Sequence, residues 1–268
     1  MAAVVNTSRA WVEKGARFGH FTKGILYGLI GALALQVALG NGGQVAGGEE
    51  AARFVGHQPF GRVLLTLIAV GLSGYSVWRF IEGIQDTEHK GHDAKGLLGR
   101  VAAVLSGLLN GALAVAVFQM ALGQADSGGG ARSWVGKLLE LPLGTVLVGL
   151  SGAVIVIAGL YQFYRAYTKQ FLEAFSFQSM SPGEQRWITR MGQIGYSARG
   201  VVFPIVGAGF LRAALEQNPN RTRDVREALT EIARSDAGQV SLGLVAAGFL
   251  AFGVFMVASA RYRRILGG

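Results

Sequence analysis

The chain has 268 residues, of which 51% are hydrophobic and only 15% are charged, and its mean hydropathy is +0.38. This composition indicates a membrane protein and argues against one or two soluble domains. A net charge of +9 would suggest nucleic-acid binding in a soluble protein, but here we expect the bilayer and its anionic headgroups as partners, and no nucleic acid. The absence of cysteine excludes disulfides and thiolate metal sites.

Six runs of the sequence contain no Asp, Glu, Lys or Arg. When one helical turn of amphipathic residues is added at each end, each run reaches the roughly 20 residues that a helix needs to cross a bilayer. The sequence therefore predicts an all-α membrane protein with six transmembrane helices and no Asp or Glu inside them, which argues against a carboxylate-coupled carrier. The runs are 24–39, 63–77, 101–122, 146–160, 201–211 and 240–260.

The six runs form three copies of one two-helix unit. Segment 16–39 is matched by 99–122 and by 192–215, with glycines in register, and a second apolar run follows at nearly the same distance in each copy. An internal repeat of this kind determines the architecture, so it takes precedence over local motifs. We expect unit one at 11–87, unit two at 95–172 and unit three at 187–268.

A short amphipathic helix is predicted in the loop between the two helices of each unit. In the first two units it follows a glycine-rich stretch and covers 49–55 and 134–139. In unit three, segment 222–234 places Val225, Leu229 and Ile232 on one helical face. These segments are expected to lie on the membrane surface as caps over the helices.

The distribution of basic residues predicts the orientation. Placing the N-terminus in the cytoplasm puts 16 of the 25 Lys and Arg residues on the cytoplasmic side and the other 9 on the opposite side. The positive-inside rule then places both termini in the cytoplasm, and we expect a multi-pass protein of the plasma membrane. The second helices end in aromatics and arginine, as in 75–79 (YSVWR) and 161–165 (YQFYR), which are ordinary interfacial anchors.

Three motifs resemble a known bacterial family. They are ARxGxxxKGxxYGxxG from Ala16, GxxGYSARGxxFPxxG from Gly192, and QPFGRVLLTLIAVGLSGYSVWR from Gln58. The chain resembles the membrane proteins that carry three tandem copies of domain of unknown function 1206. The resemblance implies one pair of transmembrane helices per copy and no particular reaction, substrate or cofactor.

Unit two departs from the family pattern. Ser106 stands where the other units have Lys23 and Arg199, and Ala103 stands where they have His20 and Tyr196. If this basic position has a task shared by the other units, unit two does not perform it.

Glycines at matched positions are candidates for helix packing, because lipid offers no hydrophobic drive for helix association and small residues let backbones approach. The alternative is that glycine is simply common, with 41 in the chain. The packing candidates are Gly24, Gly28, Gly107, Gly111, Gly200 and Gly207.

Polar residues in the spans are candidates for the lining of a pathway or for interhelical hydrogen bonds. Gln36, Gln119 and Arg212 share one matched position near the outer end of the first helix of each unit, and Asn110 lies in mid-span. An arginine in such a ring would favour anions.

Four cations are candidates for contact with headgroups or another anion. Lys23 and Arg199 lie just before apolar runs, and Arg263 and Arg264 follow the last one. They could reach the headgroups as anchors or form an anion site where helices converge. His20 nearby could titrate and gate, or could be a passive interfacial residue.

No catalytic motif is present, since a nucleophile elbow, a phosphate loop and HExxH are all missing. Glu88, His89, His92 and Asp93 offer metal ligands at close spacing, although a solvated loop has the same composition. Nothing therefore suggests an enzyme or a cofactor. The first hypothesis is a scaffold or accessory subunit built as a compact bundle, and two alternatives stay open: a channel or transporter for a small solute such as an anion, and a lipid-binding protein.

Overall fold

The computed structural model describes residues 2–85, 94–124, 130–176, 178 and 180–264. Six long helices dominate it, and each contains a stretch that is long and apolar enough to cross a membrane. The predicted all-α membrane architecture is confirmed. The long helices are α1 (Ala2–Ala38), α3 (Gly61–Gln85), α4 (Ala94–Ala121), α6 (Gly144–Thr168), α7 (Pro182–Leu215) and α9 (Gly238–Tyr262).

A short helix follows the first long helix of each unit, as predicted. These are α2 (Gly48–Gly56), α5 (Ala131–Leu139) and α8 (Val225–Ala233), and the 3₁₀ helices η1 (Gln170–Leu172) and η3 (Pro219–Arg221) lie between other elements. The helix α8 buries Ala228 and Leu229 against α7 and α9. Ion pairs join the three short helices across units, because Arg226 lies 3.6 Å from Glu50 and Arg132 pairs with Glu227.

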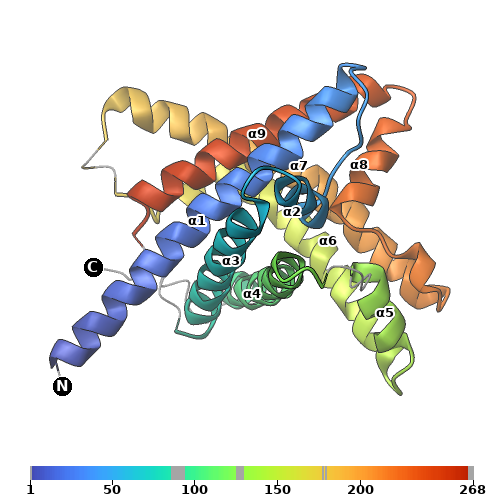
Figure 1. Cartoon of the computed structure of the whole chain (residues 1–268), viewed down its shortest axis with the longest axis horizontal. Helices are drawn as coiled ribbons and strands as arrows, with labels where there is room; N and C mark the ends of the chain where they lie inside the picture. The colour runs from blue at the N-terminus through green and yellow to red at the C-terminus, as the bar shows by residue number, and fades with distance from the viewer. Residues whose placement is uncertain (1, 86–93, 125–129, 177, 179, 265–268) are drawn as a thin grey trace.

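The long helices pack in a ring with one opening. Around the ring, α9 packs on α1, α1 on α3 and α3 on α4, while on the other side α9 packs on α7 and α7 on α6 (Figure 1). The two helices of unit two, α4 and α6, are not among the pairs that pack together within the described ranges. The ring is therefore open inside unit two.

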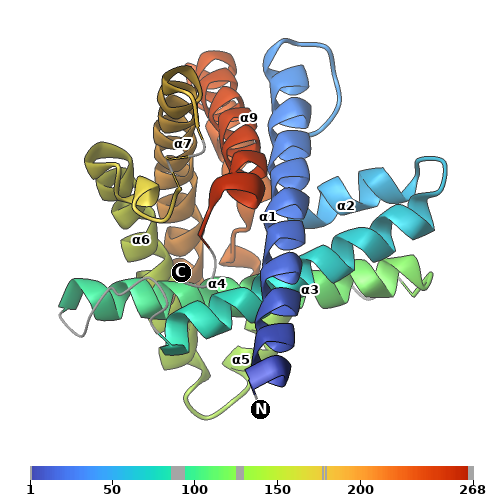
Figure 2. The same ribbon diagram turned by 90° about the vertical axis from the view of Figure 1, so that its left-hand side faces the viewer.

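The helices cross one another, which differs from the compact bundle expected for a scaffold. In Figure 2, α1, α7 and α9 run up the view, whereas α4 runs across it. Helix α4 packs closely on α3 and is not among the helices that pack on α6 within the described ranges. This arrangement leaves space between the helices, and the site described below lies there.

Glycines allow the backbones of different units to approach closely. A Cβ atom added to Gly24 of α1 would lie 2.6 Å from Val257 Cγ2 and 2.9 Å from the carbonyl oxygen of Gly253 in α9. On Gly207 of α7 it would lie 2.7 Å from the carbonyl oxygen of Gly152 in α6. No Cβ fits at such distances, so these contacts require small residues, as in other membrane helix pairs.

The other predicted packing glycines differ in what they face. A Cβ on Gly107 would lie 3.3 Å from the Phe80 ring, and one on Gly200 would lie 2.9 Å from the Phe163 ring. On Gly111 it would lie 3.0 Å from Ser76 Oγ. Gly28 has open space beside its own Cα, although its backbone nitrogen would be 2.9 Å from a Cβ on Gly253.

Candidate functional site

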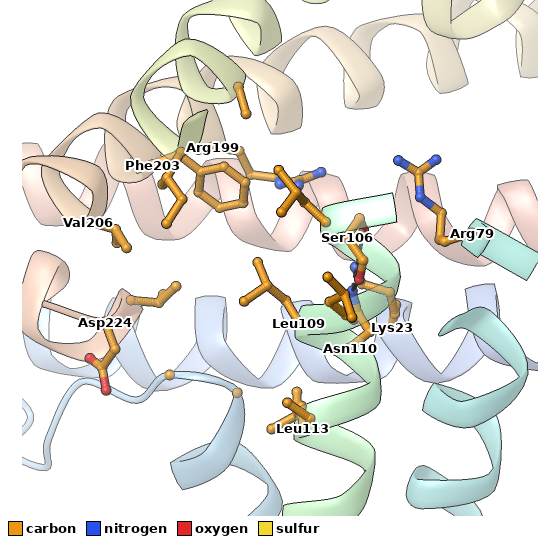
Figure 3. A pocket seen from close by; sticks show the side chains of 18 of the residues that line it. Lys23, Arg79, Ser106, Leu109, Asn110, Leu113, Arg199, Phe203, Val206 and Asp224 are labelled. Carbon is orange, nitrogen blue, oxygen red and sulfur yellow. Dashed lines mark hydrogen bonds between the residues drawn. The ribbon is translucent and has the colours of Figure 1, made fainter. Parts of the chain in front are cut away.

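A large cavity of about 1990 Å³ lies inside the ring. All six long helices contribute to its wall, together with α2, α5 and the segment that leads into α8. Figure 3 shows the wall from close by, with Leu109 projecting from α4 and Phe203 from α7. Leu108 and Leu109 line the cavity and are 55% and 60% exposed, so this wall is also open to the surroundings of the molecule.

The repeat places equivalent residues around the cavity. The same face of the first helix of each unit lines it at three successive levels, which relates α1, α4 and α7 by an approximate threefold arrangement. The matched sets are Lys23, Ser106 and Arg199; then Tyr27, Asn110 and Phe203; then Ile30, Leu113 and Val206.

Six cations gather on the wall, and we call this group the basic end of the cavity. Its C-terminal members are positioned by backbone pairing between the segment after α9 and the segment after η1. There Ser176 N donates to Tyr262 O at 3.0 Å, and Arg264 N donates to Ala174 O at 2.8 Å. The basic end comprises Lys23, Arg79, Arg165, Arg199, Arg263 and Arg264.

Aromatic rings lie against the cations of the basic end. The Tyr27 ring has Lys23 Nζ at 5.5 Å and Arg199 Cζ at 5.6 Å from its centroid, so it stands between two cations of different units. Lys23 Nζ also lies 4.3 Å from the Tyr75 ring, and Arg165 Cζ lies 4.7 Å from the Tyr196 ring. Cation–π contacts of this kind offset part of the cost of removing a cation from water.

Three of these cations make no polar contact with the described side chains or backbone. Lys23, Arg165 and Arg199 make no hydrogen bond or ion pair with any residue in the described part of the chain. Lys23 is only 6% exposed, and the buried Nε of Arg199 has no acceptor there. Because an unpaired charge away from water is costly, an anion in the cavity would be strongly stabilised.

Arg79 differs, because it pairs with a buried carboxylate. Its Nη1 lies 2.5 Å from Oε2 of Glu82, whose side chain is 1% exposed. The prediction that no Asp or Glu lies inside a spanning helix is wrong for Glu82, since α3 continues to Gln85 beyond the apolar run that ends at Val77. The pair neutralises one cation at the edge of the basic end.

The four residues considered as a polar lining are not brought together. Asn110 and Gln119 line the cavity, whereas Gln36 and Arg212 are exposed and lie outside its wall. Gln36 follows Lys23 by 13 residues, which is about 3.6 helical turns, so it lies toward the other side of α1. Helix α4 borders the opening and turns a wider face to the cavity, which includes Gln119.

The cations considered for headgroup or anion contact all lie on the cavity wall. Lys23 lies within the long helix α1, in the part that is apolar enough to cross a membrane, and its side chain is buried. His20 lies beside the cavity: it is fully buried, its Nδ1 is 2.7 Å from Ala16 O, and its ring is 4.6 Å from that of Trp78.

The possible metal ligands at 88–93 lie outside the described residues. Within the described ranges, no group of three or more His, Asp or Glu side chains is placed to hold a metal ion.

Sequence reasoning missed the role of Arg79 and Arg165. Both were interpreted as interfacial anchors, yet both line the cavity. The signal was present in the matched endings YSVWR and YQFYR, which place an arginine and a tyrosine, Tyr75 or Tyr161, on the same wall.

The repeat of this chain is shared with known proteins. Three tandem segments, 18–86, 101–169 and 194–263, match the family Domain of Unknown Function (DUF1206). The chain belongs to this family. Uncharacterized protein YxxB of Bacillus subtilis (strain 168) is 27% identical over 265 residues, which cover 99% of this chain and 96% of that protein. No solved structure matches the DUF1206 fold seen here significantly. Neither name states an activity.

Proposed function

We propose that this DUF1206 protein is a lipid-binding protein of the plasma membrane, whose cavity holds the anionic headgroup of a lipid. The observation that carries the proposal is a set of three cations on the wall of one cavity, Lys23, Arg165 and Arg199, that have no anionic partner among the described residues. Ionisable residues inside spanning helices generally mark binding sites or pathways. An anion on these side chains would supply the missing partner.

The rest of the wall suits the hydrocarbon part of a lipid. Leu26 and Leu72 line the cavity beside the basic end, and Leu109 and Ile155 line it from the two helices that border the opening. Since α4 and α6 do not pack together, a hydrocarbon chain can lie between them while the headgroup remains inside. A soluble anion would gain little from these apolar side chains.

The predicted orientation agrees with this proposal. With both termini in the cytoplasm, Arg79, Arg165 and Arg264 lie near the cytoplasmic ends of their helices. The cytoplasmic leaflet carries the negative surface potential that attracts such residues. We therefore expect the bound lipid to come from that leaflet.

The test is lipid retention by the purified protein. Native mass spectrometry would compare the wild type, the triple variant K23A/R165A/R199A and the control R212A, which removes an exposed arginine outside the cavity. We expect the triple variant to lose anionic lipid by about tenfold or more and R212A to retain it. Equal retention by all three proteins would refute the proposal.

A second candidate is passage of a small anion. The cavity wall reaches from Arg264, after the last helix, to Arg53 and Asp224 near the short loop helices, so it extends through much of the molecule. Chloride or phosphate flux into liposomes that depends on Arg199 and not on Arg212 would favour passage over lipid binding. Neither flux nor bound lipid would leave a scaffold role.

A further inference from the structure

Unit two contributes a neutral polar corner to a wall that is otherwise cationic at the same level. Ser106 occupies the position of Lys23 and Arg199, and Asn110 occupies that of Tyr27 and Phe203. We infer that Ser106 and Asn110 bind a hydroxyl group of the headgroup, so that the ligand is an anionic lipid with a hydroxylated headgroup. This inference rests on the proposed function and adds the chemical class of the lipid.

Hydrogen bonds within α4 determine which polar atoms of Ser106 and Asn110 are available to a ligand. Asn110 Nδ2 donates to the Ser106 carbonyl oxygen at 2.6 Å, and it lies 3.4 Å from Ser106 Oγ. Asn110 is only 9% exposed, so the bond holds its amide in one orientation. Its Oδ1 accepts no hydrogen bond from the described residues, and the Ser106 hydroxyl donates none.

One free acceptor and one free donor match an alcohol. A hydroxyl group both donates and accepts, so it can satisfy Asn110 Oδ1 and the Ser106 hydroxyl together. A bare phosphate monoester only accepts at its ionised oxygens and leaves Oδ1 unpaired, and unpaired buried polar atoms cost binding. An ammonium group could donate to Oδ1, but it would enter a wall that carries Lys23 and Arg199.

The repeat places this corner in the same cavity as the cations. Lys23, Ser106 and Arg199 are matched positions on α1, α4 and α7, and all three line the same cavity (Figure 3). A phosphate held by Lys23 and Arg199 therefore has the remainder of its headgroup toward α4. A glycerol esterified to that phosphate, as in phosphatidylglycerol, has hydroxyl groups where Ser106 and Asn110 can bind them.

The test compares lipids with identical acyl chains. Binding to the full chain in nanodiscs would be measured for phosphatidylglycerol, phosphatidic acid and phosphatidylethanolamine, with inorganic phosphate as a soluble competitor. We expect the wild type to prefer phosphatidylglycerol over phosphatidic acid by about fivefold to tenfold, the effect of one or two buried hydrogen bonds. We expect N110L to lose that preference and to keep its affinity for phosphatidic acid.

Two further variants keep the test interpretable if N110L does not fold. S106A removes one hydroxyl with little change in shape and should lower the preference by a smaller factor. S106K restores the cation of the other units and should shift the preference toward phosphatidic acid, which can carry a second negative charge. An unchanged preference in both N110L and S106A would overturn the inference and leave the proposed function intact. If no anionic lipid binds the wild type, or if inorganic phosphate displaces it fully, the proposed function fails as well.

Discussion

Unit two differs from units one and three in two respects that belong together. In units one and three the two long helices pack on each other, and the matched position carries Lys23 or Arg199. In unit two α4 and α6 pack on neighbouring units instead, and the matched position carries Ser106. Each unit contacts both of the other units, so the opening inside unit two does not separate the ring into parts. One divergent copy thus gives the cavity one open side and one neutral residue at the level where the other units carry Lys23 and Arg199.

The largest effect should come from breaking the buried ion pair of unit one. Glu82→Gln removes the buried carboxylate that pairs with Arg79 beside other cations, which should lower the free energy of unfolding by about 3–5 kcal/mol. The matched arginine of unit two forms no ion pair with the described residues, so Arg165→Ala should cost only about 0.5–1 kcal/mol through its contact with Tyr196. Unfolding in mixed SDS micelles would measure both.

The double variant R79M/E82Q is the control for this prediction. Removing the charge together with its partner should recover much of the loss. Equal destabilisation by E82Q and R165A would show that the two units do not differ at this position.

The next largest effect is expected from a comparison of two residues at the same matched position. One lies in unit three, whose long helices pack together, and the other lies beside the opening in unit two. Val202 of unit three is fully buried, whereas Leu109 of unit two lines the cavity and is 60% exposed. V202W should cost about 3 kcal/mol because the core has no room for the ring. L109W should change stability by less than about 0.5 kcal/mol. Thermal unfolding in detergent would report both, and equal shifts would mean that unit two is closed.

A smaller effect is expected at the contact between units one and three. A methyl group on Gly24 would meet α9 at 2.6 Å, whereas one on Gly28 would meet no atom within 4 Å. G24A should therefore cost about 2 kcal/mol, and G28A should be nearly neutral. Both variants add the same methyl group to the same motif of the same helix. A large loss of stability in G28A alone would therefore contradict the contact described between α1 and α9.

Much of the fold could be predicted from the sequence, for physical reasons that differ between its parts. Membrane spans need about 20 apolar residues each, so their number follows from hydropathy. The repeat predicted three copies of one two-helix unit, and the first helices of all three copies line one cavity. The opening could not be predicted, because the packing of α4 on α3 and of α6 on α7 depends on contacts between units that no local pattern reveals.

The site was predicted less completely than the fold. The apolar run from Gly24 suggested that Lys23 lies at the membrane surface, but α1 continues on both sides of Lys23 and its side chain is buried in the cavity wall. Gln36 and Arg212 were grouped by their matched position, which says nothing about the side of the helix that faces the cavity. Glu82 was missed because its charge is compensated by Arg79, and a hydropathy run ends at charges whether or not they are paired.

The smallest expected effect concerns pH at the loop end of the molecule. Asp224 Oδ1 caps α8 by accepting a hydrogen bond from Glu227 N at 2.9 Å. Burial raises the pKa of Asp224 above its usual value of about 3.8, and the nearby carboxylates of Glu50 and Glu227 add to the rise against the opposing hydrogen bond and Arg226. The folded state therefore holds this proton more tightly than the unfolded state. Its contribution to stability is full below that usual value and is lost as pH rises through the raised pKa.

Asp224→Asn tests this sign, because asparagine keeps a cap acceptor and cannot ionise. The variant should match the wild type at the acidic end of the window and become the more stable of the two as pH rises toward neutrality. Unfolding measured across that window would show the two proteins diverge, and E49Q, which removes the carboxylate of the Glu49–Arg53 ion pair on α2, is the control. A wild type that gains on D224N as pH rises would mean that the charged carboxylate is favoured at the α8 cap, and that the loop end is better solvated than the burial of Asp224 indicates.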